Sequence, residues 1–240
     1  MKRSDPTLRA AEPRIAALIS EYGLFEGIFE PLISILGALA GEHAPTAVKN
    51  PLEGADVHIA DSLSGLETIR EGNHSVIADI GSGCGIPGLV LAAALPDSEV
   101  IAVESQGRKC DFVEEAAANA GIGNIRSAWA RAEEWHEGFS ACDVVTARAL
   151  ADLPVVFEYA APLLKQGGRV VAWKGKLEDG EIERGATAAE ALLMSSPELV
   201  TVEPWVGGGV RKLVVSRREG ELPPNFPRRP GMATKRPLGS

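Results

Sequence analysis

The chemically most distinctive residues form a glycine-rich stretch, Asp79-Ile80-Gly81-Ser82-Gly83-Cys84-Gly85-Ile86-Pro87-Gly88. It follows a β-rich run at 76–80 and precedes an apolar segment that predicts a helix. Alternate glycines let the backbone turn sharply and approach a ligand with no Cβ in the way, and the first turn of the helix offers free N–H groups. The stretch therefore predicts a loop that binds a nucleotide-like ligand.

Two ligands fit this loop. Gly83, Gly85 and Gly88 satisfy the dinucleotide fingerprint, and Glu104 follows near the spacing of a ribose-binding acid. Asp79, at the strand tip, is a poor neighbour for a pyrophosphate but a good one for S-adenosylmethionine, which carries an ammonium and a sulfonium. The residues favour S-adenosylmethionine, and an NAD(P)-dependent oxidoreductase is the alternative.

Residues after the later strands predict the other wall of the site, because ligands of open α/β sheets lie beyond the carboxyl ends of the strands. Arg131-Ala132-Glu133-Glu134 follows the third predicted strand and could meet an adenine edge. Arg148 ends the fourth strand and could contact the carboxylate of the donor or the acceptor. Lys174 ends the fifth strand and, like Arg131, could contact a phosphate.

The elements that must position these residues change in type near residue 73. Apolar residues recur at helical spacing before this point, and the third of the predicted helices spans 56–70. Short β-rich runs then alternate with helical segments, which predicts a parallel sheet with crossover helices. The strands are expected at 76–80, 99–103, 125–129, 143–147 and 169–173, and the helices near 86–95, 107–120, 151–164 and 178–193.

A last pair of strands, at 199–203 and 210–216, is joined by too few residues for a crossover helix and should be antiparallel. We thus expect an α/β fold with a Rossmann-like seven-stranded sheet whose last strand is antiparallel. The predicted organisation is an N-terminal helical extension (1–72), a sheet domain (73–218) and a basic C-terminal tail (219–240).

The composition is that of an ordinary globular protein, with 45% hydrophobic and 24% charged residues among 240. Cys84, Cys110 and Cys142 are widely spaced, so neither a disulfide framework nor a metal site is predicted. The cysteine pattern suits a reducing cytosol, so a cytoplasmic protein is expected. No secretory signal and no clean apolar run of 18 residues is seen, so no membrane span is predicted, and a monomer is assumed.

The charge is unevenly distributed along the chain. Its net value is −9, but residues 211–240 hold eight Lys and Arg against two Glu, a net +6 that leaves −15 for the other 210 residues. Such a segment is commonly a solvated tail, and it could also contact an anionic partner.

Several motifs together resemble the bacterial ribosomal small-subunit methyltransferase G family, also called glucose-inhibited division protein B. They extend in one order over about 180 residues: H-I-A-D-S at 58–62, D-I-G-S-G-C-G-I-P-G at 79–88, E-S-Q-G-R-K at 104–109, R-A-E-E at 131–134, A-R-A at 147–149, K-G at 174–175, R-K-L-V-V at 211–215, P-R-R at 227–229 and K-R-P-L at 235–238. The resemblance implies a class I S-adenosylmethionine-dependent methyltransferase that methylates guanine N7 in 16S ribosomal RNA, with the RNA or the 30S particle as its partner.

The resemblance also implies where the ligands bind. Cofactor contacts are expected at Gly81, Ile86, Ala132, Glu133 and Arg148, beside the loop residues Asp79 and Gly83 and the ribose acid Glu104. RNA contacts are expected at Arg131, Lys174, Arg228, Arg229, Lys235 and Arg236. A nonenzymatic RNA-binding protein on the same fold is a further alternative.

The implied reaction requires no general base, because guanine N7 already presents an in-plane lone pair. Alignment and desolvation of the reactants could then supply the catalysis. His58 and Asp61 lie three residues apart on a predicted helix and could hydrogen-bond to each other, but their roles stay open.

Overall fold

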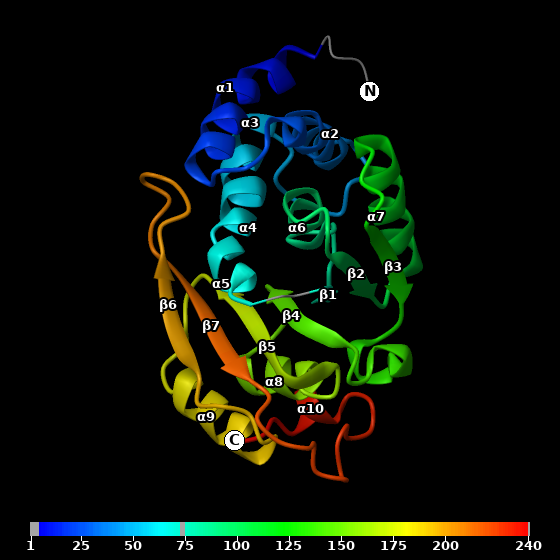
Figure 1. The fold of residues 1–240 in the computed structure, drawn as a ribbon, viewed down its shortest axis with the longest axis vertical. Helices are drawn as coiled ribbons and strands as arrows, with labels where there is room; N and C mark the ends of the chain where they lie inside the picture. Colours follow the sequence, from blue (N-terminus) through cyan, green and yellow to red (C-terminus); the bar gives the residue numbers. More distant parts are fainter. Residues whose placement is uncertain (1–4, 73–74, 240) are drawn as a thin grey trace.

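The computed structural model describes residues 5–72 and 75–239, and its centre is one seven-stranded sheet. The strand order is β3-β2-β1-β4-β5-β7-β6 (Figure 1). The strands are β1 (Val76–Ile80), β2 (Glu99–Glu104), β3 (Ile125–Trp129), β4 (Cys142–Arg148), β5 (Leu164–Lys174), β6 (Glu198–Val202) and β7 (Arg211–Arg217). The first five are parallel, and β7 is antiparallel to both of its neighbours. The predicted sheet, with its antiparallel end, is confirmed.

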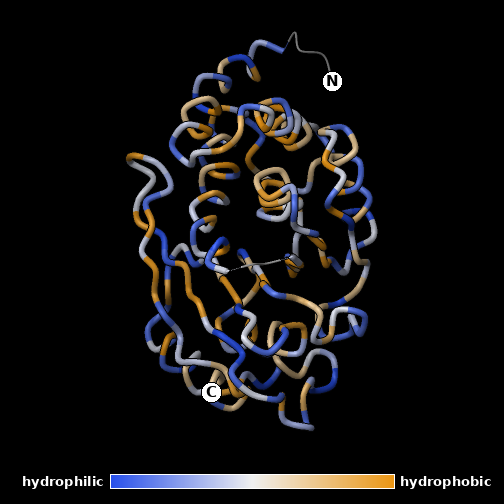
Figure 2. The backbone as a smooth tube through the Cα atoms, viewed as in Figure 1, coloured by the Kyte–Doolittle hydropathy of each residue, from blue (hydrophilic) through white to orange (hydrophobic). Residues whose placement is uncertain are grey.

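Helices cover both faces of the sheet (Figure 1). On one side of the sheet, α6 (Gly88–Ala94) and α7 (Gly107–Ala120) contact the strands, α2 (Phe29–Ala40) packs on these two helices and α1 (Pro6–Glu21) packs on α2; α8 (Leu153–Ala160) and α9 (Glu181–Ala191) lie on the other side. Alternation along β1 divides the two cores, since Ile77 belongs to the first and Ile80 to the second. Figure 2 shows that the strands and the inner helices α2 and α6 are mostly hydrophobic. The N-terminal helices thus share one core with the sheet.

The segment that follows α2 is a helix with an irregular middle. It consists of α3 (Pro51–Gly54), a π-helical turn (Ala55–Ala60), α4 (Asp61–Leu63) and α5 (Leu66–Arg70). It begins before the predicted residue 56, because the Asn50 side chain accepts the N–H groups of Leu52 and Glu53. π-turns often lie at functional sites, and this one presents the Val57 carbonyl to Arg148 Nη2 at 2.8 Å.

The crossover helices α6, α8 and α9 are shorter than expected, and β5 is longer. α8 begins at Leu153 with Pro154 in its first turn, and α9 begins after Gly180, whose φ is +73°. Proline suits a first turn because its missing N–H has no partner there, and glycine suits a positive φ. β5 starts at Leu164, where an irregularity in its pairing with β4 accommodates additional residues.

The C-terminal segment lies along α8. Its short helix α10 (Met232–Lys235) contacts α8, and the Thr234 hydroxyl is 3.2 Å from that of Tyr159. Arg228 Nε donates to Oε1 of buried Glu158 at 2.6 Å, and Nη2 donates to Oε2. The basic segment is therefore anchored to the domain by at least one of its own cations.

None of the helices within the described ranges combines the length and the apolarity that crossing a bilayer requires.

Candidate functional site

The glycine loop lies at the carboxyl end of β1 and adopts a conformation that favours glycine. Gly81, Gly83 and Gly85 have φ values of +65°, +59° and +79°. A Cβ at Gly81 would stand 2.5 Å from Leu150 Cδ1, and one at Gly85 would stand 2.7 Å from Leu89 Cδ1. Both contacts are too close for a side chain, so the glycines permit the loop to pack between these leucines.

Glu104, at the end of β2, is buried and oriented by the loop. Its Oε2 accepts the Gly83 N–H at 3.1 Å, and its Oε1 accepts the Gln106 N–H at 2.9 Å and the Ser105 hydroxyl at 3.2 Å. Lys109 Nζ lies 3.9 Å from Oε2. These donors hold the carboxylate against the cavity, where remaining lone pairs can accept from ligand hydroxyls.

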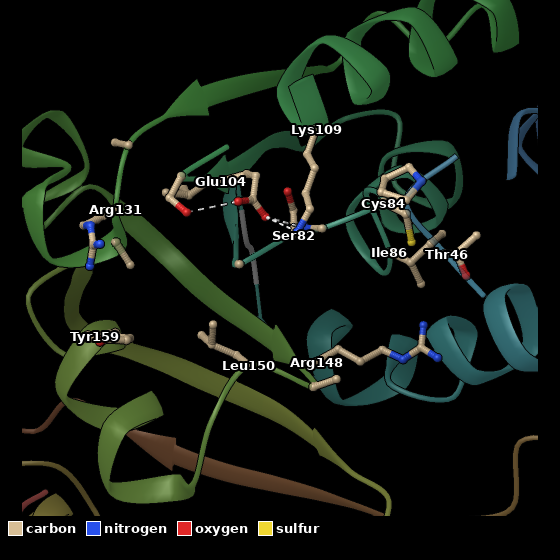
Figure 3. A pocket seen from close by; sticks show the side chains of 18 of the residues that line it. Thr46, Ser82, Cys84, Ile86, Glu104, Lys109, Arg131, Arg148, Leu150 and Tyr159 are labelled. Carbon is tan, nitrogen blue, oxygen red and sulfur yellow. Dashed lines mark hydrogen bonds and ion pairs between the residues drawn. The ribbon is translucent and has the colours of Figure 1, made fainter. Parts of the chain in front are cut away.

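A cavity of about 550 Å³ opens in front of this carboxylate (Figure 3). Glu104 lies on one side of the opening, and Leu150 and Arg148 lie across from it. The structure brings together here seven of the predicted cofactor residues and the RNA candidate Arg131. The seven are Gly81, Gly83, Ile86, Glu104, Ala132, Glu133 and Arg148.

Asp79 does not line this cavity, which corrects its predicted contact with the donor. The side chain is 1% exposed, and it lies behind the loop. Its Oδ2 accepts the Gly88 N–H at 3.0 Å and its Oδ1 accepts the Thr146 hydroxyl at 3.0 Å. Burial raises the pKa of Asp79 to about 7. The carboxyl group thus fastens the start of α6 to the sheet and supports the loop from below.

A second cavity, of about 310 Å³, adjoins the first and shares Arg148, Ala149 and Leu150 with it. Its charged lining comes from Asp61, Arg148, Lys174, Lys176 and Arg211. Lys176 is exposed and Arg211 half-buried, and the sequence had singled out neither as a site residue. The signals available were their place just after β5 and at the start of β7 and, for Arg211, the R-K-L-V-V motif at 211–215.

Lys174 lines the second cavity, and its ammonium group already has two partners within the protein. Nζ lies 2.6 Å from Oε1 of Glu181, which is 1% exposed, and it donates to the Ala151 carbonyl at 3.1 Å. A buried carboxylate holds its counter-ion strongly because separation would leave it uncompensated. The geometry therefore gives Lys174 a structural role, and its phosphate contact stays a prediction.

Arg148 is held between the two cavities by the N-terminal helices. Its Nε lies 2.8 Å from Asp61 Oδ2, and its Nη2 donates to the Val57 carbonyl. His58 does not pair with Asp61 as the spacing had allowed. It lines the first cavity instead, with Nε2 3.3 Å from the Thr46 hydroxyl. Burial, aided by Arg148, lowers the pKa of His58 to about 4, so the ring is neutral near pH 7.

The cations of the C-terminal segment have different environments. Arg228 is paired with Glu158, so the predicted phosphate contact of Arg228 competes with a buried ion pair. Arg229, Lys235 and Arg236 are exposed. The segment also reaches the first cavity, because the Gly231 N–H donates to Glu133 Oε1 at 3.3 Å.

The cysteines lack the environment of a nucleophile. Burial raises the pKa of Cys84 and raises that of Cys142 to about 12. Across residues 5–72 and 75–239, no group of His, Cys, Asp and Glu is arranged to hold a metal ion.

Comparisons of the fold find S-adenosylmethionine-dependent methyltransferases. A putative enzyme of this kind from Methanococcus maripaludis has a TM-score of 0.53 and 15% identity, over 68% of this chain and 86% of that one. An S-adenosylmethionine-dependent O-methyltransferase from Thermotoga maritima also scores 0.53, with 13% identity over 75% and 73% of the two chains. At these identities the likeness concerns the fold, which is the predicted class I methyltransferase fold.

Comparisons of the sequence identify a family. The family model described as rRNA small subunit methyltransferase G matches residues 28–204. The chain is 35% identical to ribosomal RNA small subunit methyltransferase G of Moorella thermoacetica, over 80% of this chain and 82% of that protein. It is also 35% identical to the protein of that name from Deinococcus radiodurans, over 88% and 84%. These relatives give no support to the oxidoreductase or to the nonenzymatic alternative, and the chain belongs to the rRNA small subunit methyltransferase G family.

Proposed function

We propose that this protein transfers the methyl group of S-adenosylmethionine to N7 of a guanine in 16S ribosomal RNA. The observation that carries the proposal is the pair of adjoining cavities, one built from the glycine loop and Glu104, the other bordered by Arg211 and Lys176. A nucleoside-bearing donor suits the first and a nucleotide of an anionic polymer suits the second. Family membership supports the same assignment.

The residues of the first cavity fit S-adenosylmethionine. Glu104 would accept hydrogen bonds from the ribose hydroxyls, and Ala132 with Glu133 would border the adenine. Gly81, Gly83 and Ile86 would leave room for the methionine portion, whose carboxylate Arg148 would meet. The bound donor supplies an electrophilic methyl group.

The residues of this chain would act by position, since N7 presents its lone pair without loss of a proton. Holding two reactants in line is worth up to about 7–11 kcal/mol in intramolecular models. His58, neutral near pH 7, adds no positive charge beside the cationic donor. The shared wall of Arg148, Ala149 and Leu150 would set the approach of donor and acceptor.

The proposal is tested by mass spectrometry of nucleosides from small-subunit RNA of cells with and without the gene. We expect 7-methylguanosine to decrease in the deletion strain and to return when the gene is restored. An unchanged content of 7-methylguanosine would contradict the assignment.

Contacts with RNA would come from exposed cations near the first cavity. Arg131 lies at the rim of the first, and Arg229, Lys235 and Arg236 lie on the C-terminal segment that reaches Glu133. We propose that the partner is the RNA itself or the 30S particle.

A further inference from the structure

We propose that the second cavity holds the acceptor base and that Asp61 determines its preference for guanine by accepting a hydrogen bond from the 2-amino group. This inference rests on the proposed function and adds a specificity-determining residue to it.

The position of the second cavity suits an acceptor. It meets the donor cavity along Arg148, Ala149 and Leu150, so a base within it would lie next to the donor. Its volume of about 310 Å³ is at the small end of ligand pockets. It thus suits one base extruded from its stack, as enzymes that act on bases require.

Asp61 presents an acceptor that the protein leaves unused. The residue is 5% exposed, and its Oδ2 is paired with Arg148. Its Oδ1 is buried, and no described residue donates a hydrogen bond to it. A buried carboxylate oxygen without a donor is unfavourable. A ligand that brings an N–H group to this oxygen would relieve that cost.

Arg211 forms an ion pair with this oxygen but donates no hydrogen bond to it. Its Nε is 3.7 Å from Oδ1, beyond hydrogen-bond distance, and its side chain is 31% exposed. The guanidinium also lies 5.4 Å from the Trp205 ring centroid, so an alternative partner is at hand. Once displaced, Arg211 could join the exposed Lys176 at the mouth of the cavity and contact a phosphate.

The backbone of Asp61 is held at the second cavity by a hydrogen bond from Trp173. Trp173 Nε1 donates to the Asp61 carbonyl at 2.8 Å and ties this turn to the end of β5. The carboxylate therefore starts from a fixed position and can discriminate among bases that enter the cavity.

The chemistry of the bases explains why a carboxylate would select guanine. Guanine is the only RNA base with a 2-amino donor, whereas adenine offers the lone pair of N1 on this edge and would be repelled. The 2-amino group lies on the pyrimidine ring of guanine, across the base from N7. A base anchored at Asp61 by this group therefore keeps N7 free for the methyl group.

The test is a cycle of two enzymes and two substrates. Wild type and Asp61→Asn are assayed on reconstituted small subunits that carry guanine or inosine at the methylated position, since inosine lacks only the 2-amino group. Asp56→Asn is the matched control, because Asp56 pairs with Arg14 at 2.7 Å on the same helical segment and lies outside both cavities. Calorimetry measures the Kd of S-adenosylmethionine for each protein.

We expect inosine to lower kcat/KM of the wild type by about tenfold or more, as for a hydrogen bond to a charged group. Asp61→Asn should show a similar loss on guanine and no further loss on inosine, with an unchanged Kd for S-adenosylmethionine. Asp56→Asn should behave as wild type.

Three results would overturn the inference. They are equal wild-type activity on guanine and inosine, full additivity of the two changes, and a Kd for S-adenosylmethionine that weakens as much as kcat/KM falls in Asp61→Asn. The last would mean that Asp61 acts through Arg148. The wild-type comparison needs no folded variant, and a wild type inactive on guanine would instead contradict the proposed function.

Discussion

Glu104 has two tasks at the residue scale, since it holds the glycine loop and faces the donor cavity. Glu104→Gln keeps the shape but removes the charge and turns one acceptor into a donor. We expect the Kd for S-adenosylmethionine to rise about 10- to 100-fold, which corresponds to about 1.5–3 kcal/mol for hydrogen bonds to a charged group. Glu99→Gln, at the opposite end of β2, is the control and should bind normally. Calorimetric titration decides, and an unaltered Kd for Glu104→Gln would reject the role.

His58 predicts a pH dependence of stability. Its pKa is about 4 in the folded protein and about 6.5 when unfolded, so the unfolded chain binds the proton more readily. The free energy of unfolding should therefore fall as the pH drops below 6.5, by about 2 kcal/mol between pH 7 and pH 5 from this group alone. Urea denaturation of wild type and His58→Gln at both pH values gives the fall in the free energy of unfolding for each protein. The difference between the two falls is the contribution of His58.

Asp79 contributes a slope of the opposite sign. Its pKa is raised to about 7 in the folded protein, so its contribution to stability decreases as the pH rises from about 4 through 7. Both proteins in the His58 comparison retain Asp79, so its effect cancels. If wild type and His58→Gln lose equal stability between pH 7 and pH 5, His58 is not held neutral.

At the scale of the elements, the connection between α4 and α5 packs against the end of β5, beside the second cavity. The Trp173 ring occupies the space that a side chain at Gly65 would need, with Cζ2 only 2.2 Å from an ideal Cβ. Gly65→Ala should displace Trp173 and destabilise the protein by about 1–3 kcal/mol, as overpacking does. Thermal and chemical denaturation measure the loss.

The matched control for this junction is Gly123→Ala. A Cβ at Gly123 meets no atom within 4 Å, and its φ is not in the left-handed region. We expect this variant to unfold as wild type does. Equal stability of the Gly65→Ala and Gly123→Ala variants would show that Trp173 can yield without cost.

For the whole molecule, the distribution of charge governs the encounter with RNA. The first 210 residues carry −15 and the last 30 carry +6, so approach to phosphates should favour the C-terminal end. Changing Arg229, Lys235 and Arg236 to Ala together should raise KM for the RNA substrate. The slope of log affinity against log salt concentration should become shallower by about 2 to 3, because binding releases fewer counterions from the RNA when three phosphate contacts are lost.

Donor binding should be unaffected by this triple change, since none of the three side chains lines the first cavity. Arg126→Ala is the control for the loss of a surface cation, because Arg126 is an exposed residue of β3 that pairs with Glu99. This variant should leave the dependence of RNA affinity on salt unaltered. Arg228 is excluded from the set because its loss would leave buried Glu158 without its counter-ion. A triple variant with wild-type KM and salt slope would leave the segment without a role in binding RNA.

The sequence by itself determined which strands are parallel and that the sheet has an antiparallel end. It also determined that the glycine loop and Glu104 lie at the same edge of the sheet. These features follow from local spacing and from the rule that parallel strands present their carboxyl ends at one edge. The positive φ angles of Gly81, Gly83 and Gly85 are likewise a local requirement of the turn.

The partners of charged side chains were decided by the tertiary structure. Lys174 meets Glu181, Arg228 meets Glu158 across 70 residues, and Asp61 meets both Arg148 and Arg211. Asp79 has the residue type of a ligand contact but points behind the loop, toward Thr146. Periodicity assigns a residue to an element and a face, whereas its partner depends on which distant segment packs beside that face, and that choice is made by the packing of the whole core.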